Sequence, residues 1–309
     1  MIRKDFLKFA ALAGGYYAAS GKIAESISPF QNNMKGLTAS ELQKYLVSLT
    51  QLKEKTVDRI IIGDPSTKIK KIGTCWMPYQ ETCQKAVESG VNVLVTHEPT
   101  FYTHWDLDEN HAEFQSSSEF TKNLYTQQIE KKKKWITDNG LVIIRNHDTM
   151  DALKDVGIPF ALGKFLGFEN SEIIASRTYY NVYKVKKQAA SLFAGKIAKK
   201  LSEIGQPGVA FYGDPDYQVA SVGIGTGCIC DPLEFADLKP DIFISIDDVV
   251  RTWTQTTYAA DTGNPLIVIN HGTSEEMGMR ALNLLINNKF PEIETIHFNQ
   301  GCTYKWITG

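Results

Sequence analysis

The stretch Val91-Asn92-Val93-Leu94-Val95-Thr96-His97-Glu98-Pro99 contains the pattern that decides the fold of this chain. The apolar run 91–95 is short, and runs of this kind are typical of strands buried on both faces of a parallel sheet. It follows a helix-like segment, 78–90, whose end is indicated by Gly90. A histidine and a carboxylate come directly after the strand. The stretch therefore predicts an α/β protein with reactive side chains at the carboxyl edge of its sheet.

The same pattern occurs three more times, each with a different polar ending. The apolar runs are 141–144, which leads to Asn146-His147-Asp148, 240–246, which leads to Asp247-Asp248, and 265–269, which leads to Asn270-His271. In open α/β sheets, ligands bind beyond the carboxyl ends of the strands, because loops from several units converge there. We therefore expect these polar endings to share one site.

The hydrophobic patterns along the sequence predict two α/β halves with a smaller segment between them. A long helix is expected over 113–139, whereas Tyr179 to Val185 alternate as in a strand and are followed by a small-residue helix at 189–204. The resulting division of the chain is an export signal at 1–20, a linker at 21–36, a first α/β half at 37–170, a small α+β insertion at 171–221 and a second half at 222–309 that completes the site.

Composition excludes several classes of protein. The 309 residues carry a net charge of −2, and no arginine-rich or aromatic-interleaved tract is present, so we expect no nucleic-acid partner. The basic run Lys131–Lys134 is interpreted as a solvated helix face. The odd number of cysteines argues against a disulfide scaffold. Cys228 and Cys230 are interpreted as small packing residues, with a metal or redox pair as the alternative.

The first twenty residues resemble a bacterial export signal. Arg3, Lys4 and Lys8 supply a basic start, residues 9–19 are apolar, and this stretch ends in the small residues 18–20. The order Arg-Lys-x-Phe-Leu-Lys resembles a twin-arginine signal in which lysine replaces the second arginine. The apolar run is too short to span a bilayer, so no stable membrane insertion is expected. We predict an exported, periplasmic protein that begins near Gly21, with a cytoplasmic protein carrying an amphipathic N-terminal helix as the alternative.

Three of the six histidines follow strand candidates and have carboxylates nearby. They are His97, His147 and His271, with Glu98, Asp148, Asp151 and Glu275 as neighbours. Thr273 and Ser274 are suitable N-caps, so His271 is expected at a strand tip and Glu275 in the first turn of a helix. His147 and Asp151 are expected in a loop, where one of them orients a ligand rather than binding metal itself.

Mixed imidazole and carboxylate ligands suit zinc, manganese, iron or cobalt, whereas all-oxygen sites favour magnesium or calcium. Other chemistries lack their motifs in the sequence. The glycines at 223, 225 and 227 do not have the spacing of a dinucleotide-binding or phosphate-binding loop. Neither a GxSxG nucleophile turn nor an HExxH helix is present.

The ordered motifs resemble the Nif-three-like family of dinuclear metal centre proteins, also called GTP cyclohydrolase type I type two homologues. The resemblance extends from about Leu37 to the end of the chain. The motifs that carry it are 93–99 (strand and Thr-His-His-Pro), His147-Asp-Thr-Met-Asp151, the glycine-rich 222–227, Ile244-Ser-Ile-Asp247 and Asn270-His271-Gly-Thr-Ser-Glu275. It implies a two-lobed, three-layer α/β/α architecture with a mostly parallel sheet, assembled as a toroidal homohexamer.

The resemblance also implies the metal ligands. His97, Asp151 and His271 correspond to ligands, and Glu275 corresponds to the residue that bridges two metal ions. The chain departs from the family pattern at Glu98, where the second histidine of a His-His pair is expected. A carboxylate there can still bind, and we expect it to shift the preference toward manganese or iron. His104 is the alternative ligand in its place.

Two divalent ions (Zn, Mn or Fe) in such a centre would activate water as a nucleophile. We therefore predict a hydrolase acting on a small molecule, with Glu98, Asp148 and Asp247 as candidate proton-transfer groups. The family label suggests a GTP cyclohydrolase, but no substrate pocket is evident in the sequence. The alternatives are a metal-storing or metal-chaperoning assembly without turnover, and a structural scaffold.

Overall fold

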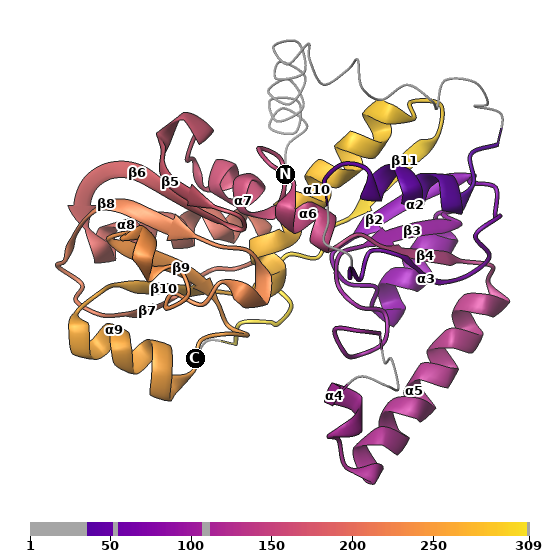
Figure 1. The fold of residues 1–309 in the computed structure, drawn as a ribbon, viewed down its shortest axis with the longest axis horizontal. Coiled ribbons are helices and arrows are strands. Elements are labelled where there is room, and N and C mark those ends of the chain that lie inside the picture. Colours follow the sequence, from indigo (N-terminus) through magenta and orange to yellow (C-terminus); the bar gives the residue numbers. More distant parts are fainter. Residues whose placement is uncertain (1–35, 52–54, 107–111, 308–309) are drawn as a thin grey trace.

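The computed structural model describes residues 36–51, 55–106 and 112–307. The predicted export signal and nearly all of the predicted linker lie outside the described residues. Within the described part of the chain, no helix has the length and apolarity needed to cross a membrane. Two lobes lie side by side and are joined near the middle of the molecule by α6 (Asp148–Ala152) and α10 (His271–Lys289) (Figure 1).

The first lobe is built on a five-stranded sheet with the order β1-β4-β3-β2-β11. Its strands are β1 (Ile60–Ile62), β2 (Lys71–Cys75), β3 (Val93–Thr96), β4 (Val142–Arg145) and β11 (Glu294–Phe298). All neighbouring strands pair in parallel except β1, which lies antiparallel to β4. Every residue of β3 and β4 is buried, as the apolar runs predicted.

Helices cover both faces of this sheet. Val93 and Val95 pack in the same cluster as α2 (Ala39–Val47) and the C-terminal half of α10, whereas Leu94 packs with α3 (Gln80–Glu88) and α5 (Glu119–Asp138). Successive side chains of a strand point to opposite faces, so a fully apolar strand requires two such layers. The expected three-layer arrangement is therefore present.

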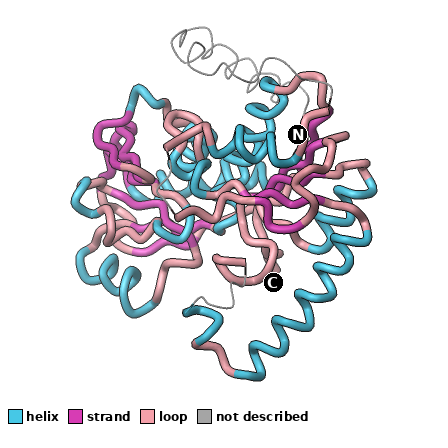
Figure 2. The backbone as a smooth tube through the Cα atoms, turned by 45° about the vertical axis from the view of Figure 1, so that its right-hand side comes forward, coloured by secondary structure: helices cyan, strands magenta, loops and turns pink. Residues whose placement is uncertain are grey.

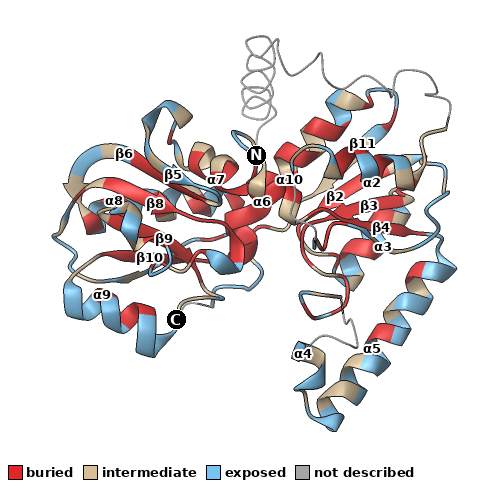
Figure 3. Cartoon of the chain, viewed as in Figure 1, coloured by how far each residue is buried: buried red, intermediate tan, exposed pale blue. Residues whose placement is uncertain are grey.

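The long helix expected over 113–139 is divided in two. The structure has α4 (Ala112–Gln115) and then α5, and the Ser118 side chain caps α5 by accepting from the Thr121 amide at 3.1 Å. Serine competes for backbone hydrogen bonds and favours caps over helix interiors, which explains the break. The N-terminal part of α5 projects from the lobe and is largely exposed (Figures 1 and 3).

The second lobe is built on a six-stranded mixed sheet with the order β5-β6-β8-β9-β10-β7. Its elements are α7 (Ile158–Leu166), β5 (Ile173–Arg177), β6 (Tyr180–Ala189), α8 (Ala190–Leu201), β7 (Ala210–Tyr212), β8 (Gln218–Ile224), β9 (Ile242–Ile246), α9 (Thr257–Thr262) and β10 (Leu266–Ile269). The segment expected as a small insertion, 171–221, thus contributes strands to the same sheet as β9 and β10. Figure 2 shows the strands in magenta, with helices in cyan around them.

Two-lobed α/β architecture is confirmed by this arrangement. The first sheet is mostly parallel, and in the second only the pairs β8–β9 and β9–β10 are parallel. The chain passes from β10 through α10 and returns to the first sheet as β11. Helix α10 therefore belongs to both lobes, and its N-terminal half is buried between them (Figure 3).

Candidate metal centre

The polar endings of strands from both sheets meet where the lobes join. His97 and Glu98 follow β3 and Asp151 lies in α6, all on the side of the first sheet, whereas His271 and Glu275 lie in the first turns of α10, directly after β10 of the second sheet. The sequence predicted one shared site at one carboxyl edge. The structure instead forms it from two sheets whose carboxyl ends face each other across α10.

Glu275 lies at the middle of this cluster and contacts both histidines. Its Oε2 is 3.2 Å from His97 Nε2, and its Oε1 is 3.2 Å from His271 Nε2. The side chains of His97 and Glu275 are completely buried. The indole of Trp76 donates to Glu275 Oε2 at 2.6 Å and thereby holds the carboxylate in place. Trp76 was not anticipated, although it follows β2 as His97 follows β3.

Two groups of potential ligands share Glu275. His97, Asp151 and Glu275 form one, and Glu98, His271 and Glu275 form the other, with the ligand atoms of each group within 4.8 Å of one another. Either group could hold a metal ion. Glu275 thus belongs to both groups, with a different oxygen facing each histidine.

The structure places Glu98 inside the cluster and His104 at its edge. Glu98 Oε1 lies 3.3 Å from His271 Nε2, and its other oxygen lies 3.7 Å from the Arg145 guanidinium. The His104 ring packs edge-on against His147 with ring centroids 5.2 Å apart, and among the described residues His104 belongs to no potential metal group. The carboxylate of Glu98 therefore occupies the position that the alternative gave to His104.

Asp151 lies in the short helix α6, and His147 is the N-cap of this helix, where a loop was expected. The two side chains are four residues apart, with His147 Nδ1 3.3 Å from Asp151 Oδ2. The helix forms because the buried Asp58 carboxylate accepts from the amides of residues 147, 148 and 149 at 2.7, 2.9 and 2.9 Å. Asp58 is about 90 residues away in sequence, so no local pattern could reveal this cap.

Supporting contacts orient both of these side chains. Thr226 donates to Asp151 Oδ1 at 2.6 Å, and the His147 ring stacks on His97 with centroids 4.4 Å apart. His147 Nδ1 also lies 2.9 Å from Asp148 Oδ1. A histidine oriented by a carboxylate in this way presents its other nitrogen in a defined direction. His147 belongs to a potential metal group with His97 and Glu98, and to another with Asp148 and Asp151.

The N-cap of α10 is Asn270, and Thr273 and Ser274, which were expected as caps, lie inside the helix. The Asn270 side chain accepts from the Thr273 amide at 3.4 Å. Asp247 accepts from the His271 amide at 2.9 Å and from the Asn270 side chain at 3.0 Å. Asp248 lies 2.6 Å from His271 Nδ1, which leaves Nε2 directed at Glu275. The cap precedes the expected Thr273 because Asp247 and Asn270 together anchor the helix start.

Buried polar atoms without partners show that a cation fits here. Among the described residues, His97 Nε2, His271 Nε2 and Glu275 Oε1 are buried and make no hydrogen bond. Unpaired buried polar atoms are costly and rare, and they are expected where an ion completes the site. Gly227 borders the same space, because a Cβ there would lie 2.8 Å from Glu275 Oε1.

Protons and a cation would compete for the same nitrogen and oxygen atoms of this cluster. Burial opposes charge on His97, but the carboxylate of Glu275 outweighs it and raises the pKa of His97 to about 9. Burial raises the pKa of Asp151 to about 7, despite the opposing effect of His97. Burial also opposes ionisation of Glu275, yet the two histidines hold its pKa well below the usual range. Metal binding to such a cluster must displace protons.

Arg145 supports the centre from behind and was also not anticipated. Its completely buried guanidinium donates to the His97 carbonyl at 2.9 Å and to the His104 carbonyl, and it lies 3.4 Å from Asp106 Oδ2. Arg145 is the last residue of β4, directly after the apolar run. A charged residue at the end of a buried strand was the sequence signal that could have indicated its role. The two cysteines near the centre differ from each other: Cys230 is buried, whereas Cys228 is exposed and its sulfur lies near Asp248 and His271.

The fold and the cluster define a two-lobed α/β protein with a buried carboxylate–histidine centre able to hold metal between its lobes. The chain belongs to the Duf34/NIF3 (NGG1p interacting factor 3) family, whose model matches residues 55–301. This confirms the family indicated by the ordered motifs.

Solved structures share the fold at low sequence identity. The Staphylococcus aureus hypothetical protein SA1388 is 18% identical, with 88% of this chain and 100% of that chain covered and a TM-score of 0.68. Reduced HcgD from Methanocaldococcus jannaschii is 17% identical, with 86% and 99% covered and a TM-score of 0.61. A Bacillus cereus protein related to NIF3 is 13% identical, with 89% and 100% covered and a TM-score of 0.65. No curated protein matches the chain.

Proposed function

We propose that this protein is a hydrolase that uses two divalent metal ions (zinc, manganese or iron) and acts on a small molecule. One set of ligands is His97, Asp151 and Glu275, and the other is Glu98, His271 and Glu275. The observation that carries the proposal is the position of Glu275, whose two oxygens each lie 3.2 Å from a different histidine nitrogen. Each of these oxygens could therefore contribute to a separate ion.

When bound, such ions supply Lewis acidity that activates water near neutral pH. The side chains of the protein position the ligands and transfer protons. Asp247 positions His271 through its backbone amide, and Glu98 faces His271 as a ligand. Asp148 is more solvent-accessible than Glu98, because 28% of its side chain is exposed against 9% for Glu98, and it lies against His147. We assign proton transfer to Asp148, acting with His147.

The first test measures the metal content of purified protein by elemental analysis. We expect two ions per chain in the wild type and a large loss in Glu275→Gln, because the neutral amide cannot bridge two cations. Glu292→Gln removes one exposed carboxylate and is the matched control, for which full metal content is expected. Protein without stoichiometric metal would support a scaffold instead.

The second test measures turnover of phosphoester, ester, amide and cyclic-amidine substrates by the metal-loaded protein. Turnover that is lost in His271→Ala supports the hydrolase. Two tightly bound ions with no turnover in any class would instead indicate a metal-storing assembly.

We also propose that the protein is exported and that it assembles as a homohexamer. The sequence of residues 1–20 supports export, and the family pattern supports the assembly. N-terminal sequencing of native protein is expected to begin near Gly21, and light scattering of the purified protein is expected to give the mass of a homohexamer. A chain that begins at Met1 or Ile2, or a monomer in solution, would contradict these two expectations respectively.

A further inference from the structure

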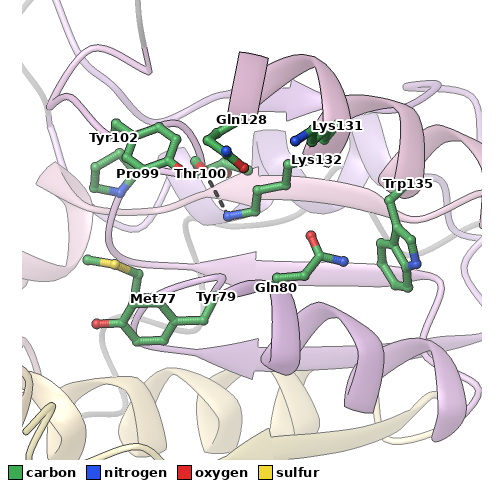
Figure 4. A pocket seen from close by; sticks show the side chains of 10 residues that line it. All are labelled: Met77, Tyr79, Gln80, Pro99, Thr100, Tyr102, Gln128, Lys131, Lys132 and Trp135. Carbon is green, nitrogen blue, oxygen red and sulfur yellow. Dashed lines mark hydrogen bonds between the residues drawn. The ribbon is translucent and has the colours of Figure 1, made fainter. Parts of the chain in front are cut away.

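The first lobe contains a cavity formed by loops that also carry residues of the metal centre. Its volume is about 540 Å³, and it is lined by Met77, Tyr79, Gln80, Pro99, Thr100, Tyr102, Gln128, Lys131, Lys132 and Trp135 (Figure 4). A volume in this range accommodates a small organic ligand. The lining comes from the loops that follow β2 and β3, together with one face of α5.

Two residues of the cavity lining are sequence neighbours of side chains in the metal centre. Met77 follows Trp76, which donates to Glu275, and Pro99 follows Glu98. The Lys132 ammonium group donates to the carbonyls of Pro78 and Thr100 at 2.5 and 2.8 Å, and so ties the two loops together. The cavity is therefore built on the same two loops that carry Trp76 and Glu98.

The described side chains that line the cavity carry positive charge. The lining contains two lysines and no acidic residue. Among the described residues, no carboxylate forms an ion pair with Lys131 or Lys132, whereas their neighbours Lys133 and Lys134 pair with Glu130 and Asp138. Lys132 uses two of its three donors on carbonyls and has one left. A partly buried cation without a counter-ion is expected to attract an anionic ligand.

The rest of the lining is suited to a flat ring. Tyr102 and Pro99 lie at one end of the cavity and Trp135 at the other, with Lys132 and Gln80 between them (Figure 4). Tyr102 is 57% exposed and its ring stacks on Tyr125, with centroids 5.3 Å apart. Its backbone has a φ of +58°, a conformation that side-chain-bearing residues seldom adopt and that is concentrated at functional sites.

We infer that this cavity binds an aromatic or heteroaromatic carboxylate and presents it to the metal centre. The carboxylate contacts Lys132 and Lys131, the amides of Gln80 and Gln128 bind polar ring substituents, and the ring lies between the aromatic side chains. One free donor on Lys132 and one further lysine match a single negative charge better than a chain of phosphates. The inference deepens the proposed function, because it names the substrate class of the same site.

The test measures the binding of benzoate, benzamide and phenyl phosphate to the metal-loaded full-length protein by ligand-observed NMR. We expect benzoate to bind at least about ten-fold more tightly than benzamide, which has the same shape without the charge. Lys131→Gln should weaken benzoate binding by about three- to ten-fold. Lys134→Gln, which removes a charge from the same helix outside the cavity, should leave it unchanged.

Equal binding of benzoate and benzamide would overturn the inference, as would unchanged benzoate binding in both Lys131→Gln and Gln128→Ala. Tighter binding of phenyl phosphate than of benzoate would overturn the carboxylate assignment. The same titration on Glu275→Gln separates this inference from the proposed function. Retained benzoate binding with lost metal supports the cavity independently, whereas normal metal content without benzoate binding removes only the cavity.

Discussion

Glu98 changes the balance of histidine and acidic candidate ligands in the centre. In the family pattern a second histidine is expected here, and the carboxylate changes the five candidate ligands to two histidines and three acids. Its two oxygens have different neighbours, because one faces His271 at 3.3 Å and the other faces Arg145 at 3.7 Å. The buried arginine therefore offsets the added negative charge, which is a physical reason why a carboxylate is tolerated at a buried position.

We predict that Glu98→Ala lowers the metal content from two ions per chain to about one. The group formed by His97, Asp151 and Glu275 remains complete in this variant, whereas His271 and Glu275 lose their third partner. Elemental analysis of the purified protein measures this loss. His104→Ala is the control and should retain two ions, and a loss in His104→Ala with none in Glu98→Ala would reverse the two assignments.

At the scale of elements, distant carboxylates hold the helix starts that carry the candidate ligands. Asp58 caps α6, Asp247 anchors the start of α10, and Glu276 ties α10 to the end of β11. Each is buried or partly buried and accepts hydrogen bonds from amides or rings of a different segment. The candidate ligands thus depend on contacts between segments that are far apart in the chain.

We predict that Asp58→Ala destabilises the protein by about 2–4 kcal/mol, because several buried donors at the start of α6 lose their acceptor. Metal content should fall as well, since Asp151 lies in this helix. Urea denaturation measures the change in the free energy of unfolding. Asp64→Ala removes an exposed carboxylate whose hydrogen bonds, among the described residues, come from Ser66, and it should cost less than about 1 kcal/mol. Equal losses in the two variants would contradict the role of Asp58.

A pH dependence of stability follows from Glu276. Burial opposes its ionisation, but the His297 ring 3.0 Å away, together with Arg280, lowers its pKa from 4.5 to about 2. A carboxylate with a lowered pKa in the folded state stabilises the protein above its unfolded-state value, and this contribution is lost as the pH falls from about 4.5 to about 2.

The free energy of unfolding of the wild type should therefore fall more steeply over this pH range than that of Glu276→Gln. Urea denaturation at pH 6 and pH 3 measures both slopes. Parallel slopes for the two proteins would show that Glu276 does not contribute.

At the scale of the whole molecule, α10 joins the two lobes and passes close to α7. A Cβ on Gly278 would lie 2.3 Å from Ile158 Cδ1 and 3.2 Å from its Cα, so the helices approach too closely for a side chain. The centre lies in the preceding turns of α10, and its geometry depends on the same approach. The close approach of α7 and α10 therefore determines both the distance between the lobes and the positions of the candidate ligands.

We predict that Gly278→Ala destabilises the protein by about 1–3 kcal/mol, because the added methyl group forces α7 and α10 apart. Thermal or urea denaturation measures this. Gly195→Ala, in the interior of α8 with open space around it, is the matched control and should be neutral or stabilising by up to about 1 kcal/mol. A neutral result for Gly278→Ala would show that the lobes can separate without cost.

The sequence by itself determined the local elements and most of the candidate ligands. Strands β3, β4, β9 and β10 were evident as short apolar runs, and His97 and His271 were evident because polar residues follow those runs directly. Asp151, and Glu275 as a shared ligand, were indicated through the family motifs. These signals are local, since periodicity and the residue after a strand are read within about ten positions.

Only the tertiary structure decided how these pieces combine. The sequence did not show that the strands belong to two sheets, that Trp76, Arg145 and Asp58 hold the centre, or that Glu275 lies between two histidines from opposite lobes. Strand partners and buried polar contacts join residues up to about two hundred positions apart. Such pairings depend on the total burial and hydrogen bonding of the folded chain, which no short stretch of sequence contains.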